Sequence, residues 1–218
     1  MRVPIEDPVL GKITVEDLME GLIHVRFSDQ KILALTFLRF AEHFENPKFK
    51  GKYFKREEFV DWYTATKGEF TYHDDWDGFN IPSDILKPFF EGKFDPLSPE
   101  EKSFIGLFKE RRGAFYIIGT AESSKPSTFL HEFSHALFYL HTSYREAVIK
   151  ILQTASTPDI AEHLLTKLSY DQDVLQDEIH AYLLFEMDYL QEEGIDINKY
   201  AEVHKKLKTL FDTHSQYK

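Results

Sequence analysis

Residues 127–141 read STFLHEFSHALFYLH, with the polar group HEFSH set between two apolar flanks. Ser127 or Thr128 can cap the N-terminus of a helix here, and the apolar flanks predict that this helix is buried. Residues four apart on a helix lie one turn apart on the same face, so His131 and His135 point in the same direction. We therefore predict a buried helix that presents two imidazoles from one face.

The spacing H-E-x-x-H within this helix is typical of a metal site. Two imidazole ligands and an open position for water suit Zn²⁺. Glu132 follows the first histidine directly, so it can contact a metal-bound water without ligating the metal, and can take the proton of that water as it attacks a carbonyl. The alternative interpretation is that His131 and His135 are core residues, hydrogen-bonded to the backbone.

A catalytic zinc ion usually has a third protein ligand. Residues 177–182 read DEIHAY and place ionisable side chains at the edge of an apolar stretch, where an unpaired charge is costly. On a helix, Glu178 and Tyr182 share a face, whereas His180 points about 200° away from Glu178. We predict Glu178 as the third ligand; the alternative is that Glu178 forms a salt bridge or lies on a solvated helix face.

A second candidate for the third ligand is His141, six residues after His135. Phe138 stands where the longer signature HExxHxxGxxH has glycine, so the helix is expected to continue through Tyr139. His141 would then point about 240° away from His135. We expect it to face away from the metal.

HEFSH, followed at position 178 by the glutamate of DEIHAYL, resembles the gluzincin branch of the zincin metallopeptidases. The resemblance covers about residues 113–190. It implies that Glu178 is a zinc ligand, that Glu132 is the general base, and that an edge strand beside the HExxH helix binds extended peptide. Many gluzincins orient the first histidine with an aspartate four residues after this glutamate; Tyr182 takes that position here, and Asp177 is the candidate substitute.

Residues 114–119 (AFYIIG) are short, aromatic and β-branched, and they are placed to be that edge strand. We expect residues 67–97, which are rich in Gly, Pro and Asp, to be a surface connection with a short helix, or an active-site loop. Capping and periodicity signals predict further helices that start at Thr14, cover 28–46, 55–65 and 98–111, start near Ser143 and Thr157, run from Asp171 or Asp173 to Gly194, and cover 198–212.

The expected fold is mainly α with a small central β-sheet (α+β). We expect a single zincin-like domain over residues 1–218, in which the HExxH helix packs beside the short edge strand and a long C-terminal helix carries Glu178. Within it, residues 1–112 would form an N-terminal helical lobe and residues 113–218 a catalytic lobe.

Composition narrows the classes of protein and partner. The net charge of −11 disfavours nucleic acid, so the basic stretch at residues 48–56 (KFKGKYFKR) is interpreted as a solvated loop. The absence of cysteine excludes disulfides and Cys-based zinc sites. No signal peptide pattern and no apolar run of membrane-spanning length are present, which predicts a soluble, cytoplasmic protein without a membrane partner.

The favoured function is hydrolysis of a peptide bond in a peptide or protein substrate, with Zn²⁺ held by His131, His135 and Glu178. Glu132 would activate the water. The candidates for stabilising the tetrahedral oxyanion are, in this order, Tyr182, His180 and Tyr144. Two alternatives remain open: a zincin fold used as a binding or regulatory module with weak or no turnover, and a helical interaction protein without metal.

Overall fold

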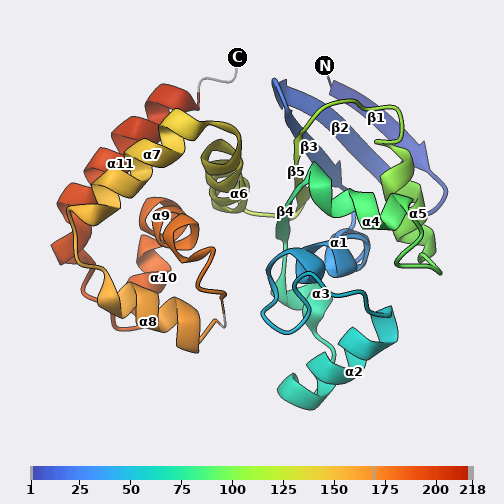
Figure 1. Cartoon of the computed structure of the whole chain (residues 1–218), viewed down its shortest axis with the longest axis horizontal. Coiled ribbons are helices and arrows are strands. Elements are labelled where there is room, and N and C mark those ends of the chain that lie inside the picture. Colours follow the sequence, from blue (N-terminus) through green and yellow to red (C-terminus); the bar gives the residue numbers. More distant parts are fainter. Residues whose placement is uncertain (1, 169, 216–218) are drawn as a thin grey trace. The chain divides into compact units, whose positions relative to one another are not determined.

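The computed structural model describes residues 2–168 and 170–215, and the chain divides into two compact units between residues 125 and 126 (Figure 1). The mixture of one sheet with many helices confirms the α+β class. The first unit contains the strands β1 (Arg2–Asp7), β2 (Gly11–Met19), β3 (Leu22–Phe27), β4 (Gly78–Pro82) and β5 (Tyr116–Ala121), and the helices α1 (Gln30–Glu45), α2 (Arg56–Lys67), α3 (Tyr72–Asp75), η1 (Ser83–Leu86), α4 (Lys87–Phe90) and α5 (Pro99–Gly106).

The five strands form one sheet in the order β1-β2-β3-β5-β4. β3 and β5 are parallel, with Ile23 opposite Ile117, and the other neighbours are antiparallel. β5 is therefore an interior strand, buried along its whole length, and the expectation that AFYIIG forms an edge strand is wrong. Its backbone groups are taken by β3 and β4, so β5 has no free edge for an extended peptide.

The expectation of an N-terminal helical lobe is also wrong, because Thr14 lies inside strand β2. Apolar Ile13 and Val15 alternate with Thr14, and pairing with β1 and β3 on both sides outweighs the local capping pattern. β4 arises within residues 67–97, where a surface connection was expected. The unit boundary falls after residue 125 and not after residue 112, because β5 completes the sheet of the first unit.

Helix α1 covers the sheet and carries the phenylalanine-rich core of the first unit. Phe37 stacks on Phe79 with ring centroids 5.2 Å apart and meets Phe104 edge-on at 4.8 Å. Opposite α1 the sheet has Gly119, where an added Cβ would lie 2.5 Å from the ring of Phe37. The glycine thus allows α1 to approach the sheet closely.

A buried ion pair joins α1 to α5. Arg39 donates to Glu101 through Nε at 2.6 Å and through a guanidinium nitrogen, and both residues are almost fully buried. The same glutamate accepts a hydrogen bond from the backbone N–H of Ser98, while Ser98 caps α5 in return. Glu101 therefore fixes the start of one helix and its attachment to another.

In the described residues of the second unit, all regular secondary structure is helical. Its helices are α6 (Pro126–Leu140), α7 (Thr142–Gln153), α8 (Pro158–Thr166), α9 (Leu175–Phe185), α10 (Met187–Glu192), η2 (Ile197–Tyr200) and α11 (Ala201–His214). α6 packs against α7 and α9, and α11 packs against α7 and α9 in turn. The single long helix expected up to Gly194 is interrupted at Glu186, whose φ of −121° leaves the helical region. Gly194 does end this segment, at a φ of +85°.

Helix length also bears on membrane insertion. In the parts of the chain that the structure describes, no helix is both long and apolar enough to cross a membrane.

Candidate metal centre

Helix α6 presents the two histidines as the sequence predicts. The Nε2 atoms of His131 and His135 lie 3.1 Å apart, and Phe133 and Leu137 are buried on the helix. The helix begins at Pro126, so Ser127 lies within its first turn and does not cap it. The shared direction of the two imidazoles is confirmed. The helix is buried over residues 132–137, whereas the flanking Phe129 and Leu130 are only half-buried.

Helix α9 brings Glu178 to the same place. Its Oε1 lies 3.8 Å from His135 Nε2, and one ligand atom from each of His131, His135 and Glu178 lies within 4.8 Å of the others. Tetrahedral zinc with bonds of 2.0–2.1 Å places its ligand atoms about 3.3 Å apart. Two of the three separations, 3.1 and 3.8 Å, lie on either side of that value, and the third is no more than 4.8 Å, so small side-chain movements would bring the three atoms to the spacing of such a site.

The chemistry of Glu178 also suits the binding of a cation. Only 4% of this residue is exposed, and its Oε2 is buried without a hydrogen-bond partner. A buried carboxylate oxygen with no partner is costly unless a proton or a metal ion neutralises it. Burial accordingly raises the pKa of Glu178 to about 7, although the neighbouring His135 and His131 act in the opposite direction.

His135 lies among several carboxylates. Its burial disfavours the charged imidazolium, but Asp177 and Glu178 outweigh this effect and raise the pKa of His135 well above its usual value. The cluster therefore retains protons in the absence of a cation, and a divalent ion would take their place.

We call His131, His135 and Glu178 the ligand group. Asp177 links its member His135 to a chain of buried polar side chains. Asp177 Oδ2 lies 3.0 Å from His135 Nδ1, and Asp177 Oδ1 lies 3.5 Å from His180 Nδ1. His180 Nε2 lies 2.8 Å from the hydroxyl of Tyr144, and neither His180 nor Tyr144 is exposed. Burial would raise the pKa of Asp177, but His135 outweighs it and lowers that pKa. Asp177 is therefore placed to orient the ring of His135.

His131 also lies near a carboxylate. His131 Nδ1 lies 3.6 Å from an Oε of Glu186, the residue at the break between α9 and α10. No local pattern indicated Glu186, because a continuous helix was expected there. The break brings this carboxylate beside His131.

Glu132 is buried in the same cluster, and its charge acts on the pKa of both His135 and Glu178. Tyr182 meets the ring of His131 edge-on, with centroids 5.5 Å apart. Both ring nitrogens of His180 are instead directed to Tyr144 and Asp177. Of these two residues, only Tyr182 has its ring against His131.

His141 lies outside the ligand group. Helix α6 ends at Leu140, and His141 occupies the cap position of α7 in an extended conformation. The three residues that converge are His131, His135 and Glu178. The geometry therefore favours the glutamate over His141, as the helical spacing predicts.

The chain matches no family model, no curated protein and no solved structure. An assignment of function therefore rests on the geometry and chemistry of this centre.

Proposed function

We propose that the chain is a zinc-dependent metallopeptidase of the gluzincin type, acting on a peptide or protein substrate. The observation that carries the proposal is the convergence of His131, His135 and Glu178, whose ligand atoms lie within 4.8 Å of one another. The buried, unpartnered Oε2 of Glu178 supports the presence of a cation.

Zn²⁺ suits this group because two imidazoles and one carboxylate leave the fourth tetrahedral position open. When bound, the ion would polarise the scissile carbonyl and lower the pKa of its water towards about 7. Glu132, which follows His131 directly and lies in the helical turn between the two histidines, would accept the proton of that water and pass it to the leaving amine.

The remaining side chains have roles that follow from their positions. Asp177 would fix the ring of His135 with Nε2 towards the metal, and Glu186 would do the same for His131. Tyr182 is the favoured donor to the developing oxyanion, because its ring lies against His131. We assign His180 and Tyr144 a positioning role, since they contact Asp177 and each other.

A second candidate function is a zinc-binding module with weak or no turnover. The position of β5 favours it, because the strand expected to bind substrate is paired on both sides. Binding without catalysis needs the same three ligands but makes no demand on Glu132.

The deciding experiment compares the wild-type chain with Glu132→Gln on a diverse peptide library, with zinc content measured in parallel. Glu132→Gln keeps volume and polarity but removes the proton acceptor, so cleavage should fall about 100-fold or more while zinc content is unchanged. Glu146→Gln, on the exposed side of α7, is the matched control and should retain full activity.

The possible outcomes separate the candidates. Cleavage that persists in Glu132→Gln contradicts the metallopeptidase mechanism. A wild-type chain that holds zinc but cleaves no peptide of the library supports the binding module.

A further inference from the structure

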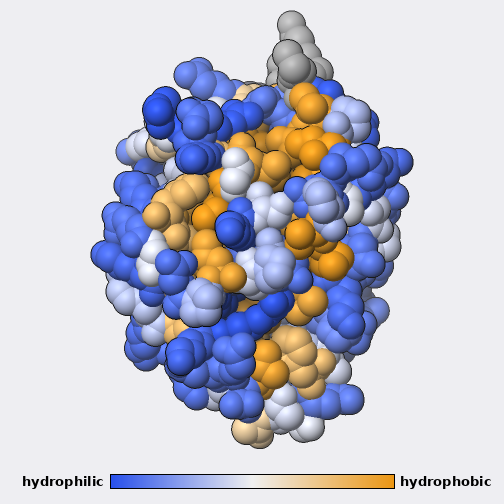
Figure 2. Space-filling view, turned by 90° about the vertical axis from the view of Figure 1, so that its right-hand side faces the viewer, coloured by the Kyte–Doolittle hydropathy of each residue, from blue (hydrophilic) through white to orange (hydrophobic). Residues whose placement is uncertain are grey.

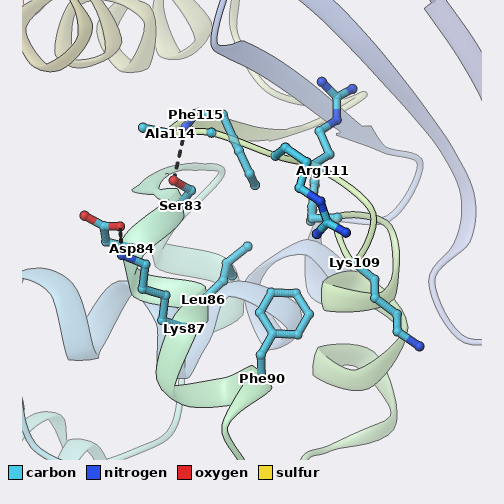
Figure 3. Close-up of a pocket in the computed structure, with 12 residues that line it drawn as sticks. Ser83, Asp84, Leu86, Lys87, Phe90, Lys109, Arg111, Ala114 and Phe115 are labelled. Atoms are coloured by element: carbon cyan, nitrogen blue, oxygen red, sulfur yellow. Dashed lines mark hydrogen bonds and ion pairs between the residues drawn. The ribbon is translucent and has the colours of Figure 1, made fainter.

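The first unit has a surface hollow of about 440 Å³, and none of the residues that line it belongs to the candidate metal centre. It is formed by two segments, residues 83–90 of η1 and α4 and residues 108–115 between α5 and β5. Figure 3 shows Asp84 and Lys87 on one side and Lys109 and Arg111 on the other, with Phe90 between them. We call it the basic hollow.

Its charge contrasts with that of the whole chain. Four cationic residues and one acidic residue line the basic hollow, whereas the chain carries a net charge of −11. Lys87 pairs with Asp84 at 2.6 Å, and Arg111 pairs with Asp17 at 2.6 Å. Lys109 and Arg112 are exposed and have no ion-pair partner within the described residues. Two positive charges are thus left for a ligand.

The floor of the basic hollow is apolar. Leu86, Phe108 and Phe115 are buried beneath it, while Phe90 is 46% exposed. Figure 2 shows hydrophobic residues reaching one face of the molecule in several places, with hydrophilic residues between them. Large exposed hydrophobic side chains are nevertheless few in the described chain: Val3, Val9, Tyr53, Trp76, Phe90 and Tyr139. Phe90 thus offers an aromatic surface beside the cationic residues of the basic hollow.

The two walls are joined by one backbone hydrogen bond and one backbone-to-side-chain hydrogen bond, which hold the shape of the hollow. Ser83 N–H donates to the carbonyl of Phe115 at 2.8 Å, and Phe115 N–H donates to Ser83 Oγ at 3.1 Å. Gly113, with a φ of +80°, allows the chain to turn between the cationic residues and β5. A fixed shape lowers the entropic cost of binding.

We infer that the basic hollow binds an acidic peptide segment of another protein. One aromatic or large aliphatic side chain of the segment would pack on Phe90, and flanking carboxylates would pair with Lys109 and Arg112. The guanidinium of arginine suits paired carboxylate oxygens, and the volume lies within the range of about 300–1,000 Å³ usual for ligand sites. A nucleic acid is disfavoured by the charge of the whole chain, and a free inorganic anion would leave the apolar floor unused.

The test measures fluorescence polarisation of a fluorescein-labelled peptide of sequence DEFED with the metal-free chain of 218 residues. Because zinc is absent, the result is independent of the proposed peptidase activity. The double variant Lys109→Glu/Arg112→Glu should weaken binding about tenfold or more, and Phe90→Ala should weaken it as well.

The matched control is Lys205→Glu/Lys206→Glu, which changes the net charge equally at exposed positions of α11. It should bind DEFED like the wild type, and the wild type should bind DEAED more weakly than DEFED. Equal weakening in the two double variants would overturn the inference, because only net charge would then matter. Tighter binding of a labelled oligothymidine than of DEFED would also overturn it.

Discussion

Asp177 Oδ2 lies 3.0 Å from Nδ1 of His135, on the opposite side of the imidazole from the nitrogen that faces His131 and Glu178. A carboxylate in this position accepts the Nδ1 proton and leaves the lone pair of Nε2 for a metal ion. In the proposed metal centre, binding would thus depend on Asp177, which is not itself a ligand.

Asp177→Asn should therefore weaken zinc binding about tenfold or more without removing a ligand. Tyr144→Phe, which removes the hydroxyl beside His180, should cause a smaller loss through the same chain of contacts. Competition with a fluorescent zinc chelator measures both effects. Asp188→Asn, at an exposed position of α10, is the control, and equal affinity in Asp177→Asn and this control would contradict the orienting role.

The chain should bind about one Zn²⁺ per molecule, and His131→Ala or His135→Ala should abolish this binding, because each variant removes one of the two imidazole ligands on which the site is built. Elemental analysis of protein purified without a histidine tag gives the stoichiometry. A metal-free preparation that takes up no zinc on titration would refute the metal centre.

Glu178→Ala should lower zinc affinity by about tenfold or more, because it removes the third ligand. His141→Ala should leave the affinity unchanged, because His141 lies outside the ligand group. Both variants are measured by the same chelator competition. If His141→Ala proves the more damaging change, the site uses three histidines and Glu178 is not a ligand.

Zinc affinity should rise with pH. The pKa of Glu178 is about 7 and that of His135 is well above its usual value, so both groups hold protons near neutral pH in the metal-free chain. Zinc must displace these protons, so affinity should increase from pH 6 to pH 8 by about tenfold or more, with protons released on binding. Calorimetry in two buffers of different ionisation enthalpy measures the release. Glu178→Gln should release fewer protons, and binding without any release would contradict the assigned ligands.

The buried ion pair of the first unit predicts a stability difference. Glu101→Ala leaves Arg39 buried and unpaired, which should lower the free energy of unfolding by about 3–5 kcal/mol. Glu100→Ala breaks the more exposed pair with Arg56 and should cost less than about 1 kcal/mol. Urea denaturation compares the two variants. A similar loss in both would mean that burial of the Arg39 pair contributes little.

The candidate site was largely predictable from the sequence because its signals are local. The turn of α6 fixes the relation of His131 to His135, and an acidic residue in an apolar helix marked Glu178. Glu186 was not predictable, since it reaches His131 only because the helix breaks there. The direction of His180 away from Glu178 followed from helical spacing, but its bond to Tyr144 depends on the packing of α7 against α9.

The sheet was harder to predict because its strands are held by residues distant in sequence. β3 pairs with β5 across some ninety residues of chain, and β4 contains Asn80 and Pro82, which read as loop residues. Thr14 and Asp17 imitate a helix start locally, while the actual partners of Thr14 are on β1 and β3. Local patterns identified α1 and α2, whose periodicity needs no distant partner.

The close approach of α1 to the sheet has a consequence for how this sequence can diverge. Any side chain at position 119 would place its Cβ 2.5 Å from the ring of Phe37 and 3.0 Å from Leu33. Both neighbours are fully buried, and in a close-packed core they can retreat only by displacing other side chains. Positions 37 and 119 should therefore vary together among homologous chains: an alanine at 119 should be accompanied by a smaller residue at 37, and an aromatic residue at 37 by glycine at 119.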